Sequence, residues 1–130
     1  MPEITKQRPK FLELSAIHLP LSGKLSIMHR ISGGALFLML PCLIYLLQLS
    51  LGTQQEFDTF RAITGYPLIK LILLALMYGF IHHFCMGIRI LLIDIHVGVE
   101  KQQAHASAVA VMVVSLALTL IFGLKLLGAY

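Results

Sequence analysis

The stretch LILLALMYGFIHHFCMGI, Leu71 to Ile88, holds no Lys, Arg, Asp or Glu and is long enough to cross a lipid bilayer as a helix. A bilayer-spanning helix needs about 20 mostly apolar residues. Windows of the same kind lie on either side, Ile31 to Leu51 and Ala106 to Leu124. The chain is 58% hydrophobic and 12% charged, with a mean hydropathy of +0.86, whereas soluble domains are roughly 45–50% apolar and 25% charged. The sequence therefore predicts a membrane protein.

The three windows predict an all-α membrane protein with three transmembrane helices in an up-down arrangement. We expect one membrane-anchor domain over residues 1–130, with a cytoplasmic or interfacial segment at 1–24 and spans at about 25–51, 66–93 and 104–128. The segment from Gly52 to Pro67 is expected to be a loop, because glycine and proline at its two ends punctuate helices.

Lysine and arginine are distributed unequally between the two sides of the predicted spans. Seven lie on the side of the N-terminus: Lys6, Arg8, Lys10, Lys24, Arg30, Arg89 and Lys101. Three lie on the other side: Arg61, Lys70 and Lys125. Because cytoplasmic loops are enriched in these residues, we expect a cytoplasmic N-terminus and a periplasmic C-terminus. The N-terminal sequence MPEITKQRPKFLEL resembles neither a secretory signal nor a mitochondrial presequence, so a bacterial cytoplasmic (inner) membrane is expected.

Two adjacent histidines, His82 and His83, interrupt the second span. An imidazole without polar partners in lipid costs several kcal/mol, so each ring needs an explanation. Residues four apart share a helix face, and the face of His83 otherwise contains the small residues Ala75, Gly79 and Gly87. That pattern suits a flat macrocycle whose iron binds the imidazole, and it equally suits close packing of small residues between helices.

His82 lies on a different face, together with the bulky residues Tyr78 and Met86. These side chains would obstruct a porphyrin, so His82 is expected to make hydrogen bonds or to face a cavity. The pattern therefore makes His83 a candidate haem ligand and gives His82 a separate role.

A second group of polar residues occurs in LSIMHRISGG, Leu25 to Gly34. Ser26 and Arg30 are four residues apart and share a helix face, with His29 adjoining them. Gly33 and Gly34 leave space about one turn later. A hydroxyl, an imidazole and a guanidinium together form a site for a polar or anionic group, although Arg30 alone would equally suit an anchor that reaches lipid headgroups.

With these motifs in hand, the chain resembles the cytochrome b membrane-anchor subunits of succinate dehydrogenase. The resemblance rests on the Arg-Pro pair near the start, on LSGKLSIMHRISGG, and on the pattern HxxxGIRxLLxD from His83 to Asp94. It covers the whole chain in length, in the three-span layout and in orientation.

The resemblance implies specific roles. His83 corresponds to an axial ligand of haem b, whose other ligand is a histidine of a second small anchor subunit. Ser26 and Arg30 correspond to residues of the ubiquinone site, and His29 and Arg30 lie near the haem propionates. An iron–sulfur subunit and a flavoprotein subunit, which oxidises succinate, are the other partners, and this subunit passes electrons to quinone without catalysing the dehydrogenation. Lipid is an expected neighbour and nucleic acid is not.

Two positions depart from the family pattern. Ile90 stands where some relatives have histidine, which removes or moves any propionate or proton role at that position. Lys24 occupies a position that is usually apolar or small, where it adds positive potential near the quinone. Asp94 is either a proton donor or a surface partner of Arg89.

Two other functions agree with the residues alone. One is a haem-free anchor that only tethers a soluble enzyme, and the other is a small transporter subunit whose histidines relay protons. A transporter would be expected to show inverted repeats or broken helices at the midplane. The sequence has no such repeat, and its polar residues gather at one predicted interface.

Overall fold

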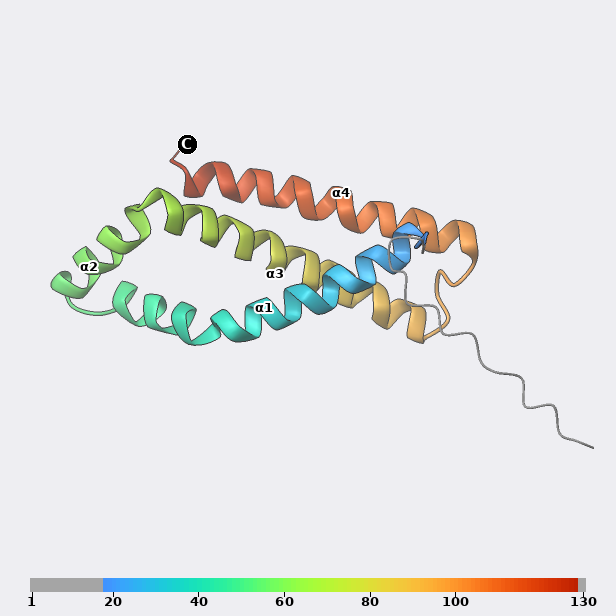
Figure 1. Cartoon of the computed structure of the whole chain (residues 1–130), viewed down its shortest axis with the longest axis horizontal. Helices are drawn as coiled ribbons and strands as arrows, with labels where there is room; N and C mark the ends of the chain where they lie inside the picture. The colour runs from blue at the N-terminus through green and yellow to red at the C-terminus, as the bar shows by residue number, and fades with distance from the viewer. Residues whose placement is uncertain (1–17, 129–130) are drawn as a thin grey trace, which may run out of the picture.

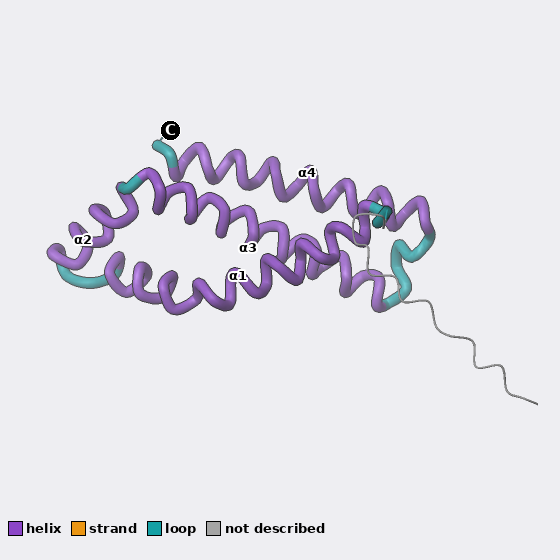
Figure 2. Tube along the Cα trace, viewed as in Figure 1, coloured by secondary structure: helices purple, strands orange, loops and turns teal. Residues whose placement is uncertain are grey.

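The computed structural model describes residues 18–128, and the regular structure in that range is entirely helical. Four helices follow one another: α1 (Leu21–Ser50), α2 (Gln54–Gly65), α3 (Pro67–Asp94) and α4 (Lys101–Leu126) (Figure 1). Only short connections separate them (Figure 2). The three long helices lie close to the predicted spans. Residues 1–17 of the predicted interfacial segment lie outside the described residues, and α1 begins within the rest of that segment.

Helix α2 corrects the sequence analysis, which expected a loop between Gly52 and Pro67. Thr53 begins the helix with a capping box, because its hydroxyl accepts a bond from the Glu56 backbone N–H while the Glu56 carboxylate accepts one from the Thr53 backbone N–H. Such reciprocal caps satisfy N–H groups that a helix start otherwise leaves without partners. The Glu56 carboxylate also accepts from the Thr53 hydroxyl at 2.9 Å, and the bonds that it accepts from the Thr53 backbone and hydroxyl hold the pKa of the Glu56 carboxyl below its ordinary value. The pair Thr53 and Glu56 is therefore a helix-start signal inside the segment that Gly52 and Pro67 marked as a loop.

Helix α3 lies between the other two long helices and packs against both α1 and α4. Its first residue is Pro67, which suits a helix start because the missing N–H would have no partner there. The α3–α4 connection turns through His96 and Gly98, both with positive φ. In Figure 1 the start of α1 and this connection lie at one end of the bundle, and α2 and the C-terminal end lie at the other.

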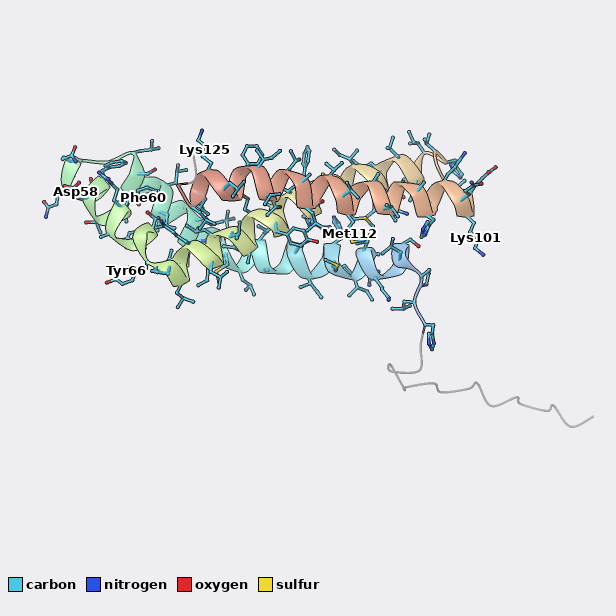
Figure 3. The ribbon with its side chains drawn as sticks, turned by 90° about the horizontal axis from the view of Figure 1, so that it is seen from above. Asp58, Phe60, Tyr66, Lys101, Met112 and Lys125 are labelled. Carbon is cyan, nitrogen blue, oxygen red and sulfur yellow. The ribbon has the colours of Figure 1, made fainter. Side chains whose placement is uncertain are left out.

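The outside of the bundle is apolar, and its buried core is small. Phe37 is 74% exposed and Leu120 is 64% exposed, whereas the core cluster consists of Leu25, Met86, Ala108 and Val111. All three long helices are apolar enough to cross a membrane. In Figure 3 the labelled charged residues Asp58, Lys101 and Lys125 lie toward the ends of the bundle. These features define a multi-pass membrane protein, whose exposed apolar surface meets lipid or other membrane helices.

Candidate functional site

The imidazole of His83 projects from α3 onto α1 and is held there by polar contacts. Its Nδ1 atom lies 3.0 Å from the backbone oxygen of His29 and 3.3 Å from the Ser32 hydroxyl. The Ser32 hydroxyl in turn donates to the same His29 oxygen at 2.9 Å. Three residues from two helices therefore meet around one ring nitrogen.

These contacts determine which nitrogen of His83 carries the proton. The His29 carbonyl oxygen can only accept, and the one hydroxyl proton of Ser32 is already directed at that oxygen. Nδ1 of His83 must therefore be the donor. In a neutral imidazole the other nitrogen then has a free lone pair, so Nε2 is the atom available to a metal. A metal-binding histidine typically donates its second ring N–H to a carbonyl or carboxylate, and His83 meets that requirement.

His29 contributes its side chain as well as its carbonyl. Its ring stacks on the ring of His83, with the ring centres 4.1 Å apart and the planes 9° from parallel. The arrangement limits how far the His83 ring can tilt, because the second flat surface lies against it. The structure thus brings together His29 and His83, which the sequence analysis assigned to neighbouring parts of one site.

The small-residue face of α3 is covered by α1 at two of its three small positions. A Cβ atom built on Gly79 would lie 3.8 Å from the Ser32 Cβ, and one built on Gly87 would lie 3.8 Å from Nε2 of His29. Ala75 is exposed. Gly79 and Gly87 therefore lie beside α1, as the alternative of close packing between helices predicts. The interpretation of this face as a groove for a macrocycle stays a prediction.

Gly33 and Gly34, which the sequence analysis expected to provide space, differ in what lies beside them. A Cβ on Gly33 would lie only 2.8 Å from Cε1 of His83, so the missing side chain makes room for the ring. A Cβ on Gly34 would meet nothing within 4 Å among the described residues. The space at Gly33 is used by His83, and the space at Gly34 faces the outside of the chain.

His82 is almost fully buried, at 1% exposure, and has surroundings different from those of His83. Its ring stacks on Tyr78 with centres 5.8 Å apart and lies next to the backbone of Leu25. Within the described residues neither ring nitrogen makes a hydrogen bond of good geometry. The expected difference between the two histidines is present, and the expected role of His82, making hydrogen bonds or facing a cavity, stays a prediction.

Ser26 and Arg30 lie on α1, within about one turn of His29. Ser26 is half-buried and Arg30 is exposed. A hollow of about 670 Å³ opens at the same end of the bundle, between the starts of α1 and α4. It is lined by Pro20, Leu21, Ser22, Lys101, Gln102, Ala104 and His105. Neither Ser26 nor Arg30 lines this hollow, so a site that contains them must be lined by other residues.

Arg89 has a structural role that the sequence analysis missed. It is 7% exposed, and its guanidinium donates to the Ser107 hydroxyl at 2.9 Å and to the Ala104 carbonyl at 3.0 Å. These bonds tie α3 to α4. Asp94, its suggested partner, is exposed at the end of α3. The hydroxyl of Ser107 in the apolar helix α4 was the signal for this contact.

Ser32 was also missed as a site residue, although it stands inside the quoted motif. The signal was its spacing of three residues from His29, which lets a serine hydroxyl reach a carbonyl one turn back on a helix. The Ser32 hydroxyl also contacts His83 because α1 packs on α3. The spacing of residues within α1 does not predict that packing.

The fold and these contacts define a helical membrane protein with a histidine-rich site where two long helices cross. Comparison with known proteins gives the family. Residues 4–122 match the model of the succinate dehydrogenase/fumarate reductase transmembrane subunit, and the chain belongs to that family.

Individual relatives agree with this assignment. A Rickettsia felis protein is 34% identical over 120 residues, which cover 92% of this chain and 93% of that protein. A Coxiella burnetii protein is 34% identical over 110 residues, covering 84% and 88% respectively. A Rickettsia prowazekii protein is 32% identical over 120 residues, covering 92% and 93%. Each is named a succinate dehydrogenase cytochrome b556 subunit.

Proposed function

We propose that this chain is a membrane-anchor subunit of a succinate:ubiquinone oxidoreductase, respiratory complex II. In this role it binds haem b together with a second anchor subunit and forms part of the quinone-reduction site. The observation that carries the proposal is the state of His83, whose Nδ1 donates to the His29 carbonyl and whose Nε2 is left with a free lone pair. The family and the names of the relatives support the same conclusion.

The residues present fit haem b as the cofactor. Nε2 of His83 would bind the iron, and a histidine of the partner anchor would supply a second ligand. His29 and Arg30 would lie near the propionates, where a guanidinium forms charge-assisted hydrogen bonds to carboxylates. Bound haem would supply reversible one-electron storage beside the quinone.

The same stretch of α1 would serve the quinone. Reduction of a quinone takes two electrons and two protons, and negative charge develops on its carbonyl oxygens. The Ser26 hydroxyl would donate to one carbonyl oxygen, and the permanently charged Arg30 would stabilise the reduced form. His29 and Asp94 are candidates for delivering protons from the cytoplasmic side. Because Ser26 and Arg30 do not line the hollow between the starts of α1 and α4, partner subunits would complete the site.

The proposed complex places the chain in the bacterial cytoplasmic membrane. The flavoprotein subunit would oxidise succinate, and the iron–sulfur subunit would pass its electrons to the anchor. This chain would not catalyse the dehydrogenation itself.

The absorbance of the purified complex tests the haem assignment. We expect the difference between its dithionite-reduced and oxidised spectra to contain the bands of a b-type haem. A complex that holds all its subunits and oxidises succinate, but lacks these bands, would instead be attached by a haem-free anchor.

The proposed topology has α1, α3 and α4 crossing the membrane in alternating directions, with a cytoplasmic N-terminus. A reporter that works only in the periplasm should therefore be active when fused after Tyr130. A reporter that works only in the cytoplasm should be active when inserted between Val97 and Gln103. The excess of lysine and arginine on the N-terminal side is the physical reason. A cytoplasmic C-terminus would contradict the proposed orientation.

A further inference from the structure

Three features of α1 touch the ring of His83, and together they form what we call the imidazole seat: the His29 carbonyl, the Ser32 hydroxyl and the bare Cα of Gly33. The carbonyl and the hydroxyl both contact Nδ1. Gly33 lies against Cε1 on the same side of the ring, where a Cβ would come within 2.8 Å. The imidazole seat therefore holds the His83 ring by polar contacts at Nδ1 and by close packing at the neighbouring atom, Cε1.

Each part of the seat limits a different movement of the ring. A hydrogen bond from Nδ1–H is strongest when its acceptor lies close to the ring plane, so the His29 carbonyl restrains rotation about the Cβ–Cγ bond. The Ser32 hydroxyl restrains the position of both the acceptor and the ring, because it contacts both. Gly33 sets how near the ring can approach α1.

We propose that the imidazole seat sets the plane and the tautomer of His83 as a haem ligand, and that Ser32 and Gly33 are positioning residues for it. This inference rests on the proposed function. Neither residue needs to touch the haem, because both act through the His83 ring. Groups that orient a metal-binding histidine also tune its basicity and hence the metal, and axial ligation sets the potential of a haem.

A purely structural role of the same residues makes different predictions. Ser32 and Gly33 also lie where α1 packs on α3, so their replacement could affect assembly alone. A packing role would change how much complex forms, but would leave the electronic state of the bound haem unchanged. A positioning role would change the haem in the complex that does form.

The test compares neighbouring glycines in the complete, purified complex. Gly33→Ala places a methyl group against Cε1, and the imidazole is the end of a side chain, so the ring can shift in response. The principal g value of a low-spin ferric haem with two histidine ligands depends on the angle between the two imidazole planes. We expect Gly33→Ala to shift or broaden that signal in electron paramagnetic resonance and to change the haem midpoint potential. Gly34→Ala should leave both at their wild-type values, because a methyl group there meets nothing within 4 Å in the described chain.

A pair of serines gives a second comparison that does not add bulk. Ser32 and Ser50 each donate to the carbonyl three residues earlier on α1, at 2.9 Å and 2.7 Å. Only Ser32 also contacts His83. Ser32→Ala should therefore broaden or shift the haem signal, and Ser50→Ala should not. This pair decides the question if Gly33→Ala prevents assembly.

Wild-type signals and potentials in both Gly33→Ala and Ser32→Ala would overturn the seat. If His83→Ala removes the haem while Gly33→Ala and Ser32→Ala keep the wild-type signal and potential, His83 remains the proposed ligand. Only the positioning role of the imidazole seat is then contradicted. If His83→Ala retains a wild-type haem spectrum, the ligand assignment itself fails, and the seat with it.

Discussion

Replacement of His83 by alanine is expected to remove the b-type haem bands from the assembled complex or to change them fundamentally. The reason is the geometry of the ring. Nδ1 is engaged with the His29 carbonyl and Ser32, so Nε2 is the nitrogen available to iron. A methyl group supplies no lone pair, and the other small residues on that helix face supply none either. The measurement is the reduced-minus-oxidised absorbance of the purified complex, normalised to the flavin content.

His82 provides the matched control, because it is the adjacent residue and has the same side chain. Its ring is buried beside Tyr78, on a different face from His83. We expect His82→Leu, which fills most of the space, to keep the haem bands, and His82→Ala to keep them in whatever complex assembles. Succinate oxidation with an artificial acceptor would report assembly separately from haem. If the haem bands survive His83→Ala and disappear with His82→Leu, the ligand lies on the helix face of His82, and the assignment to His83 is wrong.

The long helices were predictable from the sequence because lipid imposes one strong requirement. A span must be long, apolar and helical, since backbone groups have no other partners in the bilayer. The windows Ile31–Leu51, Leu71–Ile88 and Ala106–Leu124 meet that requirement by composition alone. Helix α2 was missed because Gly52 and Pro67 were read as the ends of a loop, whereas the local pair Thr53 and Glu56 starts a helix between them.

Side-chain surroundings were less predictable, because they depend on which helices meet and how closely. The difference between His82 and His83 followed from helical periodicity. That α1 covers Gly79 and Gly87 did not follow, because a face of small residues suits a helix and a macrocycle equally well. The burial of Arg89 against Ser107 and Ala104 was missed for the same reason. A motif written along one helix does not show its contacts on another.

Quinone reduction should depend on α1 in a way that succinate oxidation does not. Ser26→Ala removes a hydroxyl donor, and Arg30→Leu removes a fixed positive charge, at the place where the proposed quinone carbonyl gains electron density. Loss of one preorganised donor typically costs about 10²–10³ in turnover. We therefore expect each variant to reduce ubiquinone with succinate at a rate lower by about that factor. Oxidation of succinate by an artificial acceptor at the soluble subunits should stay at the wild-type rate.

Controls for these variants come from the same chain. Ser22→Ala removes a hydroxyl one turn earlier on α1, and Arg61→Leu removes a positive charge from α2, which lies at the opposite end of the bundle from the start of α1 (Figure 1). Both should reduce ubiquinone at the wild-type rate. The haem bands of Ser26→Ala should also be unchanged, because the hydroxyl of Ser26 is not part of the imidazole seat, whereas Arg30→Leu is expected to disturb them if its guanidinium meets a propionate. Undiminished quinone reduction in both Ser26→Ala and Arg30→Leu would remove these residues from the quinone site, and would leave the haem assignment to be decided by His83 alone.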